Sequence, residues 1–392
     1  RILATDSNES QPAVDPYDYY KHLRDQAPVS RMEADGPWQV SRHADVHAVL
    51  RDNETFSSDV SIRPPEERDG PSMLFSDPPV HNRLRKLVSR AFKPSHIERQ
   101  RELIGIRCDE LIAEMKQSAE VDLVSALAAP LPVTVIATML GVQDGDILAF
   151  KRWSDAIFSN IGDILFAEAS PAAVAAGEEM NAYFLTRIAE LRKNPKDHLL
   201  GRLVETETDE GHLDDQELLS FCRLLLIAGN ETTTGLITAS VRVFDEFPET
   251  ISQLHANPEL IPTFVEEALR FYSPFSATVR RASKDVELAG TKIAKGELVI
   301  PLMASANRDD RVFENPETFV IDRAPNPHLA FGFGIHFCLG AHLARLEGEI
   351  AVRALVREFS EIQLVEDDHS QMSALGGPSE LMVRLKQRSS PG

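Results

Sequence analysis

The sequence predicts a mainly α fold: a single large α-rich domain with a minor β region. The first observation is helical periodicity, because residues 129–141, 171–193 and 214–247 each repeat apolar side chains at spacings of three and four. The second is that strand-like segments are few and short. The third is that no internal repeat or Gly/Ser-rich linker divides the chain. We therefore expect one domain over residues 1–392, with residues 1–15 as a loose N-terminal segment.

The longest predicted helix covers residues 214–247. Asp214 and Asp215 suit a helix N-terminus, and Pro248 marks the end. A helix of this size is ~50 Å long at 1.5 Å per residue. Because its middle is apolar, we expect it to cross the interior of the domain.

The predicted β region is dispersed along the chain. Residues 285–300 have the glycine turns of a hairpin-rich segment, and Pro37–Ser41 and Leu381–Leu385 are two further candidate strands. Residues 301–337 are rich in Pro, Asn and Asp and predict a long irregular loop. A loop of this length in a compact protein usually serves a site.

Composition excludes several classes of protein. The net charge of −20 argues against nucleic acid as a partner, because phosphate binding requires an excess of Lys and Arg. No window reaches the ~18 consecutive apolar residues of a membrane span, so we expect no membrane anchor. The first residues lack a secretory pattern. Three widely spaced cysteines favour a reducing, cytoplasmic setting over a disulfide framework.

The segment Phe331–Gly340, with the sequence FGFGIHFCLG, is the strongest local feature. Its glycines allow a tight turn and close approach to a flat ligand. Cys338 directly precedes a predicted amphipathic helix at 339–357, whose N-terminal N–H groups would stabilise a thiolate. A lone Cys beside a helix is more often a buried small hydrophobe. The flanking pattern favours the functional interpretation here.

This segment resembles the haem-binding loop of the cytochrome P450 superfamily. The resemblance implies the triangular-prism-like P450 fold, with haem b (iron protoporphyrin IX) as cofactor and Cys338 as the metal ligand. The thiolate of Cys338 would donate electron density to the iron. Phe331 and Gly332 would lie against the cofactor, and the amide of Gly340 would hydrogen-bond the sulfur.

The segment Ala228–Thr233 (AGNETT) lies in the longest predicted helix. A glycine inside a helix costs about 1 kcal/mol relative to alanine, so its presence requires a reason. One explanation is close helix packing. The resemblance implies another, in which Ala228 and Gly229 form an oxygen-binding groove. Thr232 and Glu231 would then be the catalytic acid–alcohol pair that delivers protons.

The pair Glu267 and Arg270 shares one helix face. Elsewhere such a pair would be an ordinary surface salt bridge of little value. In the family the matching pair is buried, and Arg323 is the expected third partner. Its role would be folding and haem retention.

Two haem propionates require cationic or donor partners. The resemblance assigns this role to His81 and Arg85, four residues apart at a helix start, and to Arg280 and His336. Each alone could be a solvated surface group. For Arg281 we prefer that simpler interpretation.

The resemblance implies an O2-dependent monooxygenase that hydroxylates or oxidatively dealkylates a lipophilic small molecule. Electrons would come from a ferredoxin or flavodoxin with its reductase, since no reductase domain is fused here. Lys86, Arg90 and Arg345 are candidates for a basic docking patch. We expect a monomer.

The substrate pocket is expected to be mainly apolar. Its predicted lining comprises residues 58–75, Leu224, Leu225, Ala228, Ser276–Val279 and Leu375–Gly377. Arg63 and Arg68 could bind a substrate carboxylate, although loop arginines are usually only solvated. A terpenoid, steroid, fatty acid or macrolide-like compound would fit.

Two alternatives remain open at this point. A peroxide-driven peroxygenase would keep the thiolate but normally lacks an acid–alcohol pair, which Glu231 and Thr232 provide here. A haem-binding sensor or carrier would need neither a proton relay nor an open pocket.

Overall fold

The computed structural model describes residues 16–61, 71–158, 170–209, 211–365 and 377–388. It divides into two compact units. The first comprises the described residues between 58 and 100 and between 132 and 230, and the second comprises the other described residues. Our expectation of one domain over 1–392 stays a prediction. Arg63, Arg68, Leu375, Gly376 and the segment 1–15 lie outside the described residues.

The first unit is almost entirely helical. Its elements are α3 (Val80–Ala91), α4 (Pro94–Glu98), η3 (Asp144–Asp146), α7 (Ile147–Phe158), α9 (Pro171–Lys193), α10 (Leu199–Glu205), β5 (Glu207–Thr208) and β6 (Gly211–His212). Helix α9 begins where sequence predicts, because Ser170 caps it by accepting from Ala173 N at 3.2 Å and Pro171 follows. Helices α7 and α9 pack on one another through buried side chains that include Phe150 and Phe184.

Two helices cross the boundary between the units in the sequence. They are α6 (Pro130–Leu140) and α11 (Asp215–Glu246). Both confirm the predicted helices at 129–141 and 214–247 to within a residue or two. Glu217 and Asp214 start α11 as a reciprocal cap, with Glu217 N donating to Asp214 Oδ1 at 2.8 Å and Asp214 N to Glu217 Oε2 at 3.0 Å.

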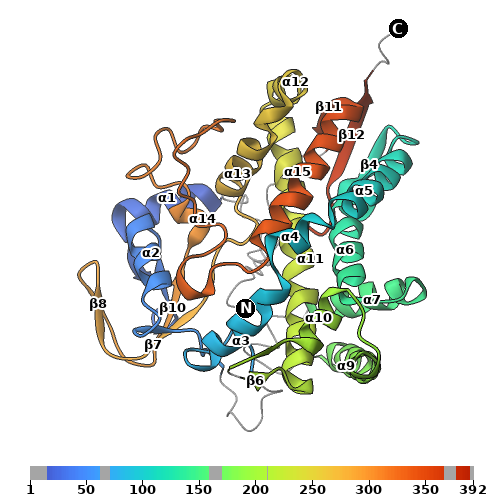
Figure 1. Cartoon of the computed structure of the whole chain (residues 1–392). Coiled ribbons are helices and arrows are strands. Elements are labelled where there is room, and N and C mark those ends of the chain that lie inside the picture. The colour runs from blue at the N-terminus through green and yellow to red at the C-terminus, as the bar shows by residue number, and fades with distance from the viewer. Residues whose placement is uncertain (1–15, 62–70, 159–169, 210, 366–376, 389–392) are drawn as a thin grey trace. The chain divides into compact units, whose positions relative to one another are not determined.

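The second unit holds the remaining helices. They are α1 (Pro16–Gln26), α2 (His43–Arg51), α5 (Arg101–Met115), η2 (Val124–Ala128), α12 (Glu249–Ala256), η4 (Pro258–Leu260), α13 (Ile261–Phe271), α14 (Met303–Ala306), η5 (Gly334–His336) and α15 (Ala341–Glu358). Helix α15 packs against α5, α12 and α13 (Figure 1). Its buried face, which includes Leu346, Val352 and Leu355, is the apolar stripe that predicted the helix after Cys338.

The strands of the second unit form small sheets. They are β1 (Val29–Arg31), β2 (Trp38–Val40), β3 (Phe56–Ser57), β4 (Glu120–Asp122), β7 (Arg280–Ala282), β8 (Val286–Leu288), β9 (Thr291–Ile293), β10 (Leu298–Pro301), β11 (Phe359–Leu364) and β12 (Met382–Gln387). The largest sheet has the order β1-β2-β10-β7-β3, with only the β2–β10 pair parallel. A second sheet has the order β11-β12-β4.

All three predicted strand regions are confirmed, and helix α2 covers β10 of the larger sheet (Figure 1). The predicted loop at 301–337 is wrong at its start, where α14 forms a helical turn. Its residues Met303–Ala306, three of which are apolar, are all buried, and this burial favours a helical turn despite the irregular pattern around them. Among the described residues, no helix combines the length and apolar character needed to cross a bilayer.

Candidate active site

The loop before α15 holds Cys338 in a fixed backbone turn. Cys338 N donates to Phe331 O at 2.9 Å, which closes the loop. Gly334 has a φ of 74°, and a Cβ atom there would lie 2.7 Å from Leu50 O. Only glycine fits this position, because a side chain would be both strained and in collision with α2. The glycine at position 334 is therefore explained by backbone geometry.

Cys338 differs from the other two cysteines in its surroundings. Cys108 and Cys222 are fully buried, whereas Cys338 is half-buried. Burial raises the pKa of Cys108 to about 12 and raises that of Cys222 as well. Cys338 stands two residues before Gly340, the N-cap of α15, and its Sγ would lie 4.0 Å from a Cβ atom on that glycine. Of the three, Cys338 has the position that suits a thiolate ligand.

A charged cluster stands behind the Cys338 loop. Arg345 of α15 donates to both carboxylate oxygens of Glu266, at 2.6 and 2.9 Å, and its guanidinium lies 4.5 Å from the centre of the Phe331 ring. His328 contacts the same carboxylate at 3.1 Å. Burial alone would raise the pKa of Glu266, but the hydrogen bonds from His328 and Arg345 hold it at about 2. The cluster ties the loop to α13 and α15.

The three cations predicted for a docking patch all have partners within the chain. Besides the Arg345–Glu266 pair, Lys86 Nζ lies 2.8 Å from Asp209 Oδ1, and Arg90 donates to Glu207 O at 3.0 Å. An electron donor would have to compete with these contacts. Their role as a patch stays a prediction.

The Ala228–Thr233 segment lies inside α11 with two different faces. Ala228 is exposed and Thr232 half-buried, whereas Asn230, between them, is 3% exposed. A Cβ atom on Gly229 would lie 2.8 Å from Ile136 Cδ1 of α6, so close helix packing favours a glycine there, and a larger residue would have to displace the Ile136 side chain. A part for Gly229 in an oxygen groove stays a prediction. Glu231 is half-buried.

Glu347 is a buried carboxyl group that sequence reasoning missed. It lies on α15, nine residues after Cys338, and is 1% exposed. Thr233 Oγ1 donates to its Oε2 at 3.4 Å, and its Oε1 has no hydrogen-bond partner among the residues that the structure describes. Burial raises the pKa of Glu347 to about 8, so the carboxyl is mostly protonated at neutral pH. The signal available in the sequence was a glutamate inside the apolar stripe of the helix that follows Cys338.

The predicted propionate ligands divide between the two units. In the first, His81 is buried, with Nδ1 3.2 Å from Asn82 Oδ1, and Arg85 is half-buried. In the second, Arg280 is buried and donates to Val279 O at 2.8 Å, and His336 is half-buried in η5. Their convergence on one ligand stays a prediction. Arg281 donates to Gly296 O at 3.1 Å on the surface, as the simpler interpretation requires.

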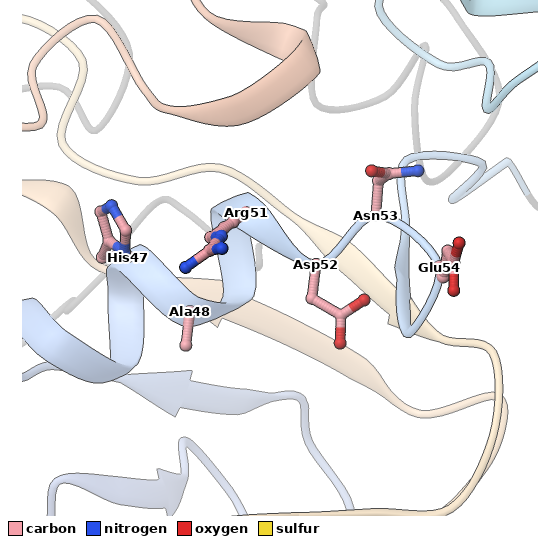
Figure 2. A pocket seen from close by; sticks show the side chains of 6 residues that line it. All are labelled: His47, Ala48, Arg51, Asp52, Asn53 and Glu54. Carbon is pink, nitrogen blue, oxygen red and sulfur yellow. The ribbon is translucent and has the colours of Figure 1, made fainter.

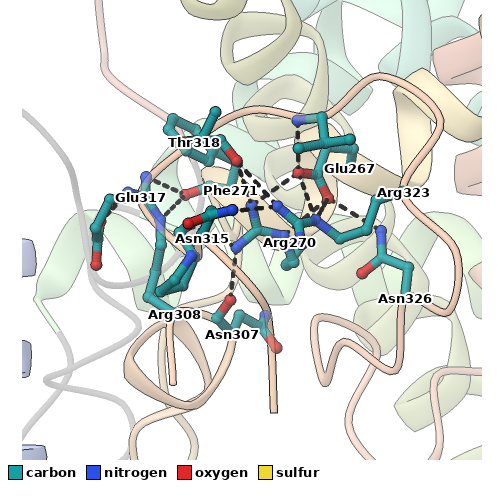
Figure 3. A network of polar contacts seen from close by, with 12 residues as sticks. Glu267, Arg270, Phe271, Asn307, Arg308, Asn315, Glu317, Thr318, Arg323 and Asn326 are labelled. Atoms are coloured by element: carbon teal, nitrogen blue, oxygen red, sulfur yellow. Dashed lines mark hydrogen bonds and ion pairs between the residues drawn. The ribbon is translucent and has the colours of Figure 1, made fainter. Parts of the chain in front are cut away.

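The predicted Glu267–Arg270–Arg323 network is confirmed (Figure 3). Arg270 donates to both oxygens of Glu267, at 2.8 and 2.7 Å, and both side chains are 0% exposed. Arg323 Nε lies 2.9 Å from Glu267 Oε1, and Asn326 Nδ2 lies 3.2 Å from Oε2. Arg270 also donates to Asn307, Pro316 and Thr318 carbonyls, which fixes the meander before the Cys338 loop.

Hollows among the described residues include two of different character. The larger, of about 500 Å³, is a surface hollow at the end of α2, lined by His47, Ala48, Arg51, Asp52, Asn53 and Glu54 (Figure 2). Its polar lining does not suit an apolar substrate. The other is a narrow hollow of the first unit between α3 and α11, where Leu84, Val88, Phe221 and the predicted lining residue Leu224 meet. Apolar side chains predominate there.

Comparison with known proteins identifies the family. A sequence profile described as Cytochrome P450 matches residues 243–383. Cytochrome P450 109 of Bacillus spizizenii is 38% identical over 371 residues, which cover 93% of this chain and 89% of that protein. This chain belongs to the cytochrome P450 family. It is therefore a haem-thiolate monooxygenase.

Other P450s agree over nearly the whole chain. The erythromycin C-12 hydroxylase of Saccharopolyspora erythraea is 38% identical over 92% of each chain. The structure of CYP109Q5 from Chondromyces apiculatus matches with a TM-score of 0.88 and 34% identity over 96% of each chain. CYP109E1 from Bacillus megaterium in complex with testosterone matches with a TM-score of 0.85 and 37% identity, over 95% of this chain and 99% of that one. These matches confirm the predicted fold.

The residues of this P450 fit a haem-thiolate cofactor. Cys338 is half-buried at a helix N-terminus, and the turn before it approaches α2 so closely that Gly334 cannot carry a side chain. His81 and Arg280 are buried groups that can donate to carboxylates. When bound, the haem supplies the oxygen chemistry of the reaction. The chain would supply the thiolate and the propionate donors.

Proposed function

We propose that this P450 inserts one oxygen atom of O2 into a lipophilic small molecule, by hydroxylation or oxidative dealkylation, with electrons from an external ferredoxin or flavodoxin and its reductase. The observation that carries the proposal is the position of Cys338. Of the three cysteines it alone is partly accessible, and it precedes α15 on a loop closed by the Phe331 carbonyl. We infer that haem b is the cofactor and that the enzyme works as a cytoplasmic monomer.

Each predicted residue has a distinct role in this proposal. Cys338 would hold the haem iron through its thiolate, and the Phe331–Gly340 loop would surround that sulfur. His81, Arg85, Arg280 and His336 hold the two propionates as cationic or neutral donors. These groups orient the cofactor and take no part in proton transfer.

Thr232 and Glu231 are proposed to deliver protons. Both lie on α11 and are half-buried, so neither is sealed from solvent in the apolar core. Thr232 would hold a proton at its hydroxyl close to the reacting oxygen, and Glu231 would resupply that proton from solvent. An intact acid–alcohol pair favours a reductase-driven monooxygenase over a peroxygenase and over a haem carrier.

The substrate is proposed to be a lipophile such as a terpenoid, steroid, fatty acid or macrolide-like compound. The narrow hollow of the first unit is lined mainly by apolar side chains, but its volume of about 10 Å³ is too small to hold such a molecule. Relatives support this class, because one is an erythromycin hydroxylase and the structure of another was solved with testosterone.

The test is a spectral screen followed by turnover. Testosterone, erythromycin and a library of neutral lipophiles are titrated into the haem-loaded protein, and the low-spin to high-spin change is recorded. Hits are incubated with a surrogate ferredoxin, its reductase and isotopically labelled O2. The proposal expects one labelled oxygen atom per product, and at least a tenfold loss of product in Thr232→Ala but not in Thr232→Ser, in line with the ~10²-fold contributions of proton-transfer groups. Equal turnover with peroxide alone would overturn it.

A further inference from the structure

The first unit contains a buried polar pair beside the proposed proton-delivery residues. Asn230 Nδ2 on α11 donates to Ser154 Oγ on α7 at 2.8 Å. Asn230 is 3% exposed and Ser154 is 1% exposed, so neither side chain is in contact with bulk solvent. A buried polar pair contributes little net stability compared with apolar packing, so its presence calls for another explanation.

Both residues interrupt apolar stripes. On α7, Ser154 shares its face with the buried side chains of Phe150, Trp153 and Ile157. On α11, Asn230 follows buried Leu226 by one turn. Two matched polar side chains in otherwise apolar faces pair well in only one register, because any shift buries an amide or a hydroxyl without its partner. The pair therefore specifies how α11 is seated on α7.

A second contact holds α11 at the same level. Gly229 lies so close to Ile136 of α6 that a Cβ atom would be 2.8 Å from Ile136 Cδ1. The helix is thus held by steric fit at Gly229 and by a hydrogen bond at Asn230. Contacts to two different helices at consecutive residues fix its rotation as well as its height.

Asn230 and Thr232 lie on the same helix, so a rotation of α11 about its axis turns both side chains together. Two residues correspond to about 200° around a helix, so Ala228 and Thr232 lie almost opposite Asn230. Their exposure agrees, because both are more exposed than Asn230. A helix rotation of about 20° moves an atom ~5 Å from the axis by roughly 2 Å. An error of about 1 Å in a reacting geometry can cost 10²-fold in rate.

We propose that Asn230 and Ser154 are positioning residues for proton delivery: their hydrogen bond sets the rotation of α11, and thereby the direction in which Thr232 and Glu231 present their side chains. The inference rests on the proposed function, in which those two residues supply protons. Neither Asn230 nor Ser154 touches a reacting atom. Their loss should leave ligand binding intact and misdirect the protons.

The test compares Asn230→Leu, Ser154→Ala and the double variant with Ser240→Ala. Ser240 is a matched control, since it is a fully buried serine of the same helix whose hydroxyl donates to its own helix at Leu236 O, 2.8 Å away. Carbon monoxide bound to the reduced, haem-loaded protein is the probe, because its infrared band responds to nearby donors. Hydrogen exchange of the α11 amides is a readout that needs no turnover.

Both single variants should broaden the carbon monoxide band about twofold and speed amide exchange at 229–233, and the double variant should add little, because both remove one interaction. With a substrate found by the spectral screen, the share of electrons lost to peroxide should rise about threefold over the wild type. The substrate concentration at half-saturation should change by less than about twofold. Ser240→Ala should match the wild type. If Asn230→Leu does not fold, Ser154→Ala, which removes one hydroxyl, carries the test.

The positioning role would be overturned if the wild type directs most electrons to product, the variants direct the same share to product, and the carbon monoxide band is unchanged. Additive effects of the two single variants would also overturn it, because the residues would then act separately. A wild type that makes no product from any lipophile would instead refute the proposed function. The two failures are therefore distinguishable.

Discussion

Two buried glutamates of the second unit, Glu267 and Glu347, have opposite surroundings. Glu267 accepts hydrogen bonds from Arg270, Arg323, Asn326 and the backbone of Val320. Glu347 accepts a single long hydrogen bond, from Thr233. Both carboxyls are 0–1% exposed. These two carboxyls are equally buried, so burial alone does not explain their different roles. The difference lies in the number of hydrogen-bond donors around each of them.

The difference follows from what each glutamate serves. Two guanidinium groups neutralise Glu267, which makes it a fixed joint between α13 and the meander before Cys338. For Glu347 the desolvation is uncompensated, so its pKa rises to about 8. Glu267 holds the meander before Cys338 in place, whereas Glu347 is a titratable group in the core.

The largest effect is expected from breaking the Glu267 network. Glu267→Leu leaves Arg270, which is 0% exposed, and Arg323 without their shared carboxylate. Removing one partner of a buried ion pair costs about 3 to 5 kcal/mol, and here two cations lose it. We expect little haem-loaded protein to accumulate, measured as the haem-to-protein ratio after purification. Normal haem content in this variant would contradict the structural role.

The second effect concerns pH. Because the folded-state pKa of Glu347 is raised from 4.5 to about 8, the folded protein holds a proton that the unfolded chain releases above about pH 4.5. The stability contribution is full below that pH and is lost as pH rises towards 8. Glu347→Gln removes this dependence. Its free energy of unfolding should exceed that of the wild type by an amount that grows by roughly 3 kcal/mol between pH 5.5 and 8.

Urea unfolding of both proteins at several pH values measures this gap directly. Thr233→Val serves as the companion variant, because it removes the single donor to Glu347. It should raise the carboxyl pKa further and extend the loss of stability to higher pH. A gap that stays constant with pH would mean that Glu347 is ionised in the fold.

A smaller effect on the free energy of unfolding is expected at Glu266, whose surroundings are intermediate between those of Glu267 and Glu347. Its pKa is held at about 2, so its contribution is present above pH 4.5 and is lost as pH falls towards 2. Glu266 and Arg345 are about a third exposed, which reduces the value of their pair. Glu266→Gln should cost about 1 to 2 kcal/mol at pH 7 and less at pH 3, measured by urea unfolding.

The smallest effect on the free energy of unfolding is expected for an ion pair at the surface, which serves as a reference for the buried carboxyls. Lys151 and Asp155 form an ion pair at 2.9 Å on α7, with side chains 43% and 57% exposed. Solvent screens such a pair, so Lys151→Gln should change the free energy of unfolding by less than about 0.5 kcal/mol. A loss comparable to that of Glu266→Gln would mean that exposure is a poor guide to the value of ion pairs here.

The sequence predicted the parts of this structure that have strong local signals. The periodic helices around α9, α11 and α15 lie within two residues of their predicted bounds, and Glu267, Arg270 and Arg323 meet as the motif implies. What it missed depends on tertiary contacts. Asn230 and Ser154 are 76 positions apart, and α14 is helical only because its apolar residues are buried.

The chemical environment of single residues was also beyond local patterns. A glutamate on α15 carries no sign of its missing donors, so the raised pKa of Glu347 could not be foreseen. Arg345 looks like a solvated surface cation in sequence, yet it is fixed by Glu266 and lies over the Phe331 ring. Partners distant in sequence decide both cases.

The central claim is that Cys338 is the thiolate ligand of the haem, and the carbon monoxide spectrum of the reduced protein tests it most directly. The wild type, Cys108→Ala and Cys222→Ala should each give the red-shifted Soret band of a thiolate–carbon monoxide complex, because both substituted thiols are buried with raised pKa values. Cys338→Ala should lose that band. A red-shifted band that persists in Cys338→Ala would contradict the account.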